Sequence, residues 1–183
     1  MSLPHLILGL LHHKPDSGYD LNKRFQQTVA HFWTTDQSQI YRTLYKLLDE
    51  GWVEVELVAQ DDNPDKKIYS ITKSGKNELV DWLQKPLEDE IVIRDASTGQ
   101  VYFGDALEPQ KLIDLQKHYV QEGEAKLQTY YAVEQAVFAE GNIEQCPLGM
   151  ELAHATLQYG IRFLEMEVTW RKELIQRIEK RLT

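Results

Sequence analysis

The sequence has few of the features that secreted, membrane-spanning or disulfide-bonded proteins need. Cys146 is the only cysteine among 183 residues, which excludes an intramolecular disulfide and fits a reducing compartment. The apolar run Leu6–Leu11 is far too short to span a bilayer. No positively charged segment precedes this run and no small-residue cleavage site follows it, so a secretory signal is not expected. We therefore expect a cytoplasmic protein that does not insert into membranes.

The motifs of catalytic and metal-binding proteins are missing as well. None of the six histidines forms a pair at the helical spacing of zinc ligands, and no cysteine cluster exists. A P-loop, a dinucleotide-binding glycine pattern and a Gly-x-Ser-x-Gly motif are absent. Asp61, Asp62 and Asp65 resemble a calcium loop only in part, and a solvated turn explains them better. We therefore expect no catalytic residue, no metal and no cofactor, and hence no enzyme.

Positive charge is also scarce, because 20 Lys and Arg oppose 29 Asp and Glu, for a net charge of −9. This balance argues against nucleic acid, since affinity for phosphates depends on Lys and Arg. The acidity is uneven, however: residues 1–85 carry a net charge of −2 and residues 86–183 a net charge of −7. The first half can therefore still present a local positive surface.

What the first half does contain is helical spacing followed by alternation. Apolar residues predict helices at 3–11, Tyr19–Phe32 and Gln37–Glu50. The breaker cluster Lys14–Gly18 should end the first helix, Asp36 should cap the third, and Gly51 should stop it in a left-handed conformation. The core face of the third helix is predicted to consist of Ile40, Leu44, Leu47 and Leu48.

Alternation begins directly after the third helix. Val53, Val55 and Leu57 are separated by acidic residues, which predicts a half-buried strand. A polar turn at 60–65 and a returning strand, Lys66–Ile71, complete a hairpin. A fourth helix should follow, from Lys73 to Gln84, with these side chains directed inward: Leu79, Trp82 and Leu83. Three helices, a hairpin and a helix are the order of a winged helix-turn-helix module.

The second half predicts long helices. The mixed apolar segment 87–106 is read as helical, and two long helices are expected at Glu108–Ala139 and Leu148–Leu182. A hairpin of two such helices is too thin to bury a full apolar stripe, so the stripe needs a partner, most simply a second copy of the chain. The residues expected to form this dimer contact are Leu152, Tyr159, Phe163, Met166, Trp170, Leu174 and Ile178.

The predicted fold is therefore mainly α with a small β-hairpin. An N-terminal winged helix-turn-helix domain, 1–86, should be followed by a C-terminal long-helix dimerisation domain, 87–183. No long Pro/Gly/Ser-rich linker separates the two.

The polar face of the third helix is the candidate reading surface for DNA. Arg can read guanine and Gln can read adenine through paired hydrogen bonds, whereas Ser and Lys suit phosphates. The side chains opposite the core face are Ser38, Gln39, Arg42, Thr43 and Lys46. By itself this pattern is more typical of an ordinary solvated helix face. Because a hairpin follows this helix directly in the sequence, we favour the DNA-reading interpretation.

Lysines on and around the hairpin are the second set of candidates. Lys66 and Lys67 lie where a wing would approach a flanking groove, although lysines on a strand edge also discourage aggregation. Further phosphate contacts near helix starts are left open for Lys23, Arg24, Lys73 and Lys76.

The motifs of the chain, taken in order, closely resemble those of the PadR family of winged-helix regulators. They run without large gaps across Leu6–Leu83. They are Ser17-Gly-Tyr-Asp-Leu21, Phe32-Trp33, Ser38-Gln-Ile-Tyr-Arg-Thr-Leu44, Asp49-Glu-Gly-Trp-Val53, Lys66-Lys-Ile-Tyr-Ser-Ile-Thr72, Ser74-Gly75 and Trp82-Leu83. Looser matches in the second half, such as Tyr102-Phe-Gly-Asp105 and Gly160–Trp170, resemble the branch with the longer C-terminal domain.

This resemblance implies a homodimer on a palindromic operator, with the third helices in successive major grooves and the wings on flanking DNA. It places Ser38, Gln39, Tyr41 and Arg42 at the DNA end of the reading helix. Many relatives have proline where this chain has Arg42, so the operator preference of the family does not carry over.

We expect a ligand-responsive transcriptional regulator, most simply a repressor. The family's founding branch responds to phenolic acids, and the chain's many aromatic residues leave open a small aromatic effector, although most of them suit a plain core. The alternative is a winged-helix module that binds protein without reading DNA.

Overall fold

A computed structural model describes residues 2–58, 66–87, 95–138 and 147–182. The chain divides into two compact units, Met1–Glu90 and Ile91–Thr183. Three predicted features lie outside the described residues: the turn 60–65, the apolar segment 91–94 and Cys146.

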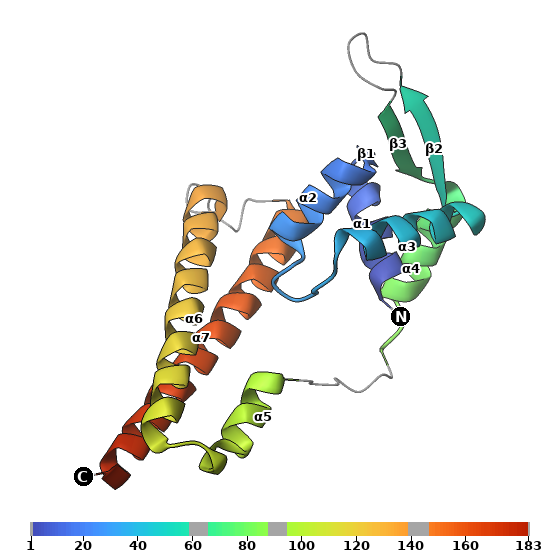
Figure 1. The fold of residues 1–183 in the computed structure, drawn as a ribbon. Helices are drawn as coiled ribbons and strands as arrows, with labels where there is room; N and C mark the ends of the chain where they lie inside the picture. Colours follow the sequence, from blue (N-terminus) through green and yellow to red (C-terminus); the bar gives the residue numbers. More distant parts are fainter. Residues whose placement is uncertain (1, 59–65, 88–94, 139–146, 183) are drawn as a thin grey trace. The chain divides into compact units, whose positions relative to one another are not determined.

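The first unit is built on three helices that follow the apolar spacing. They are α1 (Leu3–His13), α2 (Gly18–Thr28) and α3 (Gln37–Asp49) (Figure 1). The Asp36 carboxylate caps α3 by accepting the backbone N–H of Gln39 at 2.8 Å. Gly51 follows α3 with a φ of 66°, the left-handed conformation that glycine tolerates best. The core between the helices includes Ile7, Leu8, Leu11, Leu21, Phe25, Ile40, Leu44 and Leu47.

The segment between α1 and α2 differs from the prediction. Asp16–Ser17 form a short strand, β1, which pairs antiparallel with β3 (Lys66–Ile71). Two residues are too few to show alternation, and they lie within the breaker cluster, so the sequence did not predict this strand. α2 also ends earlier than expected, and the side chain of Phe32 is 42% exposed. Helical spacing shows which residues share a face, but not where the chain leaves the helix.

The sheet has the strand order β1-β3-β2, with β2 at Val53–Val58. β2 and β3 form the predicted hairpin, in which Val53 lies opposite Ile71. The prediction of a half-buried β2 is wrong beyond its first residue. Val53 is 3% exposed, but Val55 and Leu57 are 43% and 63% exposed. The hairpin projects past the helices of its unit (Figure 1), so no described helix of this unit covers its far half.

α4 (Lys73–Leu83) completes the first unit. Its start is capped by the Thr72 hydroxyl, which accepts the backbone N–H of Gly75 at 3.1 Å. Leu79 is buried as predicted, and the half-buried Trp82 ring stacks on a histidine of α1. Leu83 was expected to point inward but is 66% exposed, because α4 ends there, past the edge of the core.

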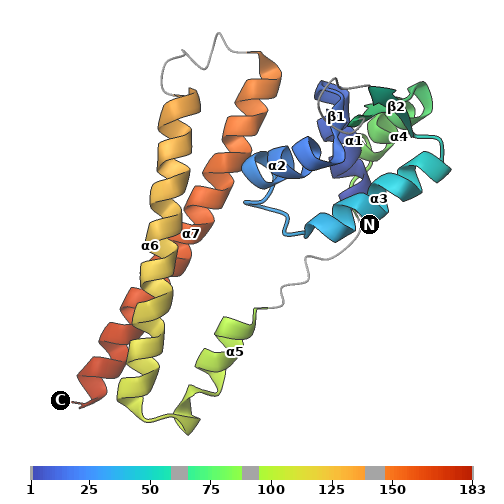
Figure 2. The ribbon, with the colours of Figure 1, turned by 45° about the horizontal axis from the view of Figure 1, so that its top comes forward.

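The second unit consists of a short helix, a 3-10 turn and two long helices. They are α5 (Ala96–Tyr102), η1 (Gly104–Ala106), α6 (Pro109–Phe138) and α7 (Leu148–Leu182). α6 and α7 run side by side in both views (Figures 1 and 2). The described helical part of 87–106 is therefore confined to α5 and η1. The core between the long helices includes Ile113, Val120, Leu127, Leu157, Ile161, Leu164, Val168 and Ile175.

A buried arginine joins three elements of the second unit. The Arg171 side chain on α7 is 2% exposed and donates hydrogen bonds to Gln116 Oε1 on α6 at 2.7 Å and to Ser97 Oγ on α5 at 2.6 Å. It also pairs with Glu167 at 2.7 Å, and its guanidinium lies 4.6 Å from the ring centroid of Tyr119. These partners compensate the buried charge of Arg171. Moving α5 away would remove one of them, which is costly for a buried charge, so the arginine holds α5 against the long helices.

Candidate nucleic-acid interface

The exposed face of α3 is a row of polar side chains on a helix that its apolar face anchors. Ile40, Leu44 and Leu47 are fully buried in the first unit. Of the predicted reading residues, Ser38, Gln39, Arg42 and Lys46 are exposed and Tyr41 is half-buried. The face is partly preorganised: Thr35 Oγ1 donates to Gln39 Oε1 at 2.8 Å, and Lys46 pairs with Glu50 at 3.6 Å. Long polar side chains on a rigid helix can reach base edges in a major groove.

The start of α2 packs closely against α3. A Cβ added to Gly18 would lie 2.5 Å from the ring of Tyr41, so the missing side chain is what admits this ring. Behind it, Tyr69 of β3 is buried, and this burial raises the pKa of its phenol, with smaller contributions from Tyr45 and Tyr41. The Tyr41 ring thus packs α3 against the start of α2, in addition to its predicted DNA contact.

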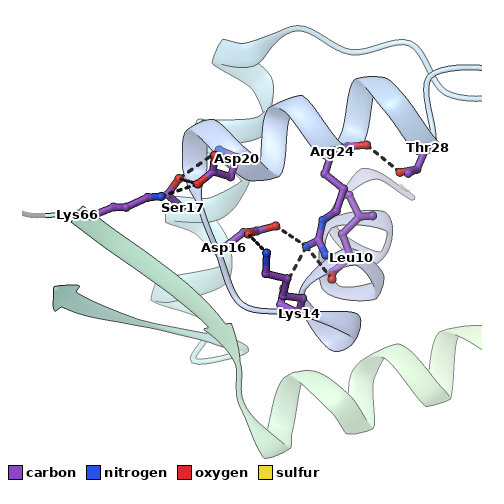
Figure 3. Close-up of polar contacts among 8 residues, drawn as sticks. All are labelled: Leu10, Lys14, Asp16, Ser17, Asp20, Arg24, Thr28 and Lys66. Atoms are coloured by element: carbon purple, nitrogen blue, oxygen red, sulfur yellow. Dashed lines mark hydrogen bonds and ion pairs between the residues drawn. The ribbon is translucent and has the colours of Figure 1, made fainter.

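The two wing lysines differ in their surroundings. Lys67 is exposed and forms no ion pair within the described part of the chain. Lys66 is half-buried, and its Nζ lies 2.6 Å from Asp20 Oδ2 at the start of α2 (Figure 3). The charge of Lys67 therefore has no internal partner in this part of the chain, whereas Lys66 already has a counter-ion.

Arg24 has a structural position that the sequence did not reveal. Its Nη2 donates to the carbonyl oxygens of Leu10 at 2.9 Å and Lys14 at 3.0 Å, and it pairs with the buried Asp16 at 2.9 Å (Figure 3). These bonds satisfy carbonyls at the end of α1 and tie α1, β1 and α2 together. The phosphate contact left open for Arg24 is therefore not supported, because its guanidinium is turned into the unit.

Asp20 is the residue of this interface that sequence reasoning missed. Ser17 caps α2, since its Oγ accepts the backbone N–H of Asp20 at 3.1 Å and donates to Asp20 Oδ2 at 2.8 Å. The hydrogen bond from Lys66, followed by that from Ser17, holds the pKa of the Asp20 carboxyl below its ordinary value. The spacing Ser17-x-x-Asp20 is that of a capping box and marks this helix start in the sequence. The pairing with a strand 46 residues later leaves no such local signal.

Most of the predicted dimer residues on α7 are exposed in the single chain. Their side chains are not part of the face that packs on α6, with the exception of Ile178, which lies against that core. Trp170 and Leu174 are half-buried. The exposed members, with exposed fractions of 51–63%, are Leu152, Tyr159, Phe163 and Met166.

A groove of about 490 Å³ lies between α6 and α7. Its charged groups and its tyrosine are paired with one another: the Tyr131 hydroxyl donates to Glu165 at 2.5 Å, and Lys172 pairs with Glu124 at 2.6 Å. Among the described residues that line it, Tyr131 is the only aromatic one and this paired lysine the only cation. A phenolate needs aromatic walls and a free donor, so the groove does not stand out as an effector site.

Clusters of metal ligands and membrane-spanning helices are both absent from the described ranges. Among these residues, no three His, Cys, Asp or Glu side chains are placed to hold a metal ion. In the same ranges, no helix combines the length and the apolar character needed to cross a bilayer.

Two family matches cover the two units in turn. Residues 7–81 match the transcriptional regulator PadR-like family, and residues 93–179 match the virulence activator alpha C-terminal family. The probable transcriptional regulator Rv1176c of Mycobacterium tuberculosis is 32% identical over 193 aligned positions, which cover 99% of this chain and 100% of the relative. The chain belongs to the PadR-like family of transcriptional regulators. Family membership also confirms that it is a regulator rather than an enzyme.

One PadR-like relative connects sequence and structure. The negative transcriptional regulator PadR of Bacillus subtilis is 38% identical over 125 residues, 68% of this chain and 69% of its own. Its crystal structure with operator DNA has a TM-score of 0.82 at 30% identity, covering 97% of this chain and 99% of that one. Its complex with p-coumaric acid has a TM-score of 0.77 at 29% identity, covering 98% and 99%. The predicted PadR-like fold, a winged helix with a C-terminal helical domain, is thereby confirmed.

Proposed function

We propose that this PadR-like regulator binds a palindromic operator as a homodimer and represses transcription in the cytoplasm until a small aromatic effector releases it. The observation that carries DNA reading is the exposed row Ser38, Gln39 and Arg42 on the buried scaffold of α3. The exposed Lys67 supports a wing contact with flanking phosphates. The similarity to a regulator crystallised with operator DNA supports the same interface.

The homodimer is supported by the apolar side chains that α7 leaves uncovered. Four large apolar residues of one stripe remain at least half exposed while another face of the same helix packs on α6. A contiguous apolar surface of this kind is typical of an interface between subunits. Two-fold symmetry would present two reading helices to a palindrome with half-sites about 34–36 Å apart.

Repression and effector response are supported by the named relative. It is a negative regulator, and it has been crystallised with p-coumaric acid. Release by a phenolic acid is therefore the effector hypothesis that we adopt for this chain. The acidic second half, with a net charge of −7 against −2 for residues 1–85, would repel DNA and leave the winged helix as the attractive surface.

Selection of bound duplexes from a random DNA pool, repeated with candidate phenolic acids, tests the whole proposal. We expect enrichment of a palindrome and its release by one of the acids. A monomeric site would contradict the dimer, and enrichment that no acid reverses would contradict the effector. If random duplex DNA shows no salt-dependent binding at all, the winged helix would instead be a protein-interaction module.

A further inference from the structure

The first lysine of the wing has an internal counter-ion on the body of the winged helix. Lys66 is the first described residue of β3, and its ammonium lies 2.6 Å from Asp20 Oδ2 on α2. Both side chains are about 40% exposed, at 40% and 39%. Lys67, the next residue, forms no ion pair among the described residues. An approaching phosphate therefore meets two adjacent lysines, one whose charge is compensated by a carboxylate and one whose charge is not.

Asp20 is held in place for this contact. Its carboxylate accepts the Ser17 hydroxyl at 2.8 Å, and the same hydroxyl accepts the backbone N–H of Asp20 at 3.1 Å (Figure 3). The side chain therefore does not need to lose much freedom to receive Lys66. The hydrogen bonds from Lys66 and Ser17 keep the pKa of Asp20 low, so the carboxylate stays ionised near neutral pH.

The pair lies beside the proposed reading surface. Gly18 lies two residues before Asp20, and a Cβ added to it would be 2.5 Å from the Tyr41 ring of α3. β1 joins the start of α2 to β3 through the pairing of Ser17 with Ile68. A duplex that meets α3 and the wing together would therefore bring its phosphates close to this ion pair.

We propose that Asp20 is the internal counter-ion of Lys66 that a DNA phosphate must displace when the wing binds. The inference rests on the proposed DNA binding and adds to it a residue that sets the affinity and its salt dependence. Asp20 lowers the affinity of the free protein for DNA, because Lys66 has to leave a carboxylate before it can neutralise a phosphate. It also weakens the salt dependence, because the carboxylate left behind takes up a cation as the phosphate releases one.

Asp20→Asn in the full-length chain tests this exchange. The asparagine can still accept the Ser17 hydroxyl, so the helix start is retained, but the counter-charge is lost. With a fluorescent random-sequence duplex, we expect tighter binding and a log–log salt slope steeper by about 0.9, the value for one additional phosphate. The gain over wild type should then be about 3.5-fold larger at about 50 mM than at about 200 mM salt.

Two further variants separate this effect from net charge. Asp81→Asn removes the same charge from an exposed residue of α4 that has no ion pair among the described residues, so it reports the general effect of lower acidity. In a Lys66→Gln background, the gain from Asp20→Asn should fall to that of Asp81→Asn, because the lysine that it frees is gone. Urea unfolding of each variant checks that the fold is kept.

The outcomes distinguish this inference from the proposed function. Weaker binding by Asp20→Asn would show that the pair holds the wing in its DNA-binding position, and would overturn the inference. A change equal to that of Asp81→Asn in the wild-type background, or an undiminished gain in the Lys66→Gln background, would overturn it as well. If the wild-type chain shows no salt-dependent binding, the proposed function fails and the inference fails with it.

Discussion

Arg42 and Lys67 are both exposed cations, but Arg42 lies on a helix and Lys67 on the hairpin. Arg42 lies on α3, the proposed reading helix, and its Nε donates to the carbonyl of Ser38, 3.4 Å away in the same helix. It can exchange this weak contact for a guanine edge without leaving a buried group unpaired. Lys67 lies on the hairpin, is exposed, and forms no ion pair within the described chain.

Replacing Arg42 with alanine should change both the affinity and the preference for DNA. We expect operator binding to weaken by about 1–3 kcal/mol and discrimination to relax at one base position. Gel-shift titrations against the selected operator and its single-base variants would measure both effects. Unchanged affinity and unchanged preference would show that α3 reads DNA with other residues.

Replacing Lys67 with alanine should weaken binding equally for all sequences. A lysine on a phosphate carries no base information, so the sequence preference should stay the same while the salt slope becomes shallower by about 1. Anisotropy titrations of operator and random duplexes at several salt concentrations provide the comparison. A loss confined to the operator would instead place Lys67 at a base edge.

At the scale of elements, two helical glycines have opposite roles. A Cβ on Gly9 of α1 would meet no heavy atom within 4 Å, whereas a Cβ on Gly75 of α4 would collide with the backbone oxygen of Trp52. Gly9→Ala should stabilise the fold by about 1 kcal/mol through helix propensity. Gly75→Ala should destabilise it by roughly 1–3 kcal/mol, since a backbone carbonyl cannot move aside cheaply.

The free energy of unfolding in urea, measured for both glycine variants, compares these two effects directly. Each variant is the control for the other, because both add one methyl group to a helix. A stabilising Gly75→Ala would contradict the close contact between α4 and the loop that precedes β2.

The cap of α5 predicts a pH dependence. Hydrogen bonds from Thr98, and then from Ser97, lower the pKa of Asp95 from 3.8 to about 2. Because the folded-state pKa lies below the unfolded one, this contribution to stability is present above about pH 4 and is lost as the pH falls toward about 2. Asp95→Asn should remove this part of the pH dependence.

Unfolding free energies of wild type and Asp95→Asn, measured across this acid range, would show the difference. The two curves should converge as the pH falls, because protonation removes the same charge that the substitution removes. Parallel curves would mean that Asp95 titrates normally in the folded chain.

Long elements could be read from the sequence, and short ones could not. The bounds of α7 agree with the prediction, and those of α6 differ by one residue at each end, because many turns repeat one apolar spacing. β1 was missed, since two residues carry no period and its only partner strand is far away in the chain. The half-buried pattern of β2 was misread, because alternation shows which side chains share a face but not whether anything covers that face.

At the scale of the whole molecule, the exposed stripe of α7 predicts the oligomeric state. Phe163→Glu places a charge within the predicted subunit contact and should shift the chain toward monomers, since an unpaired buried charge is costly. Sedimentation equilibrium measures this shift. Gln176→Glu is the control, because it adds the same charge to an exposed position about 140° around the helix from Phe163.

A dimer that survives Phe163→Glu but not Gln176→Glu would place the interface on a different face of α7. Loss of the dimer should also weaken operator binding, since the second half-site then binds independently and the effective concentration is lost. A monomer that kept full operator affinity would contradict the palindromic arrangement.

The sequence by itself determined the class of fold, the order of the long helices and of the hairpin, and the polar face of α3. These follow from local spacing: Asp36 and Gly51 delimit α3, and its apolar face leaves Ser38, Gln39 and Arg42 outside. Only the tertiary structure decided which charges of the winged helix are free. Arg24 and Lys66 look like any other basic residues in the sequence, and their acidic partners can be assigned only in the folded chain. Arg24 is turned inward onto Asp16, and the charge of Lys66 is held by Asp20 on a different element.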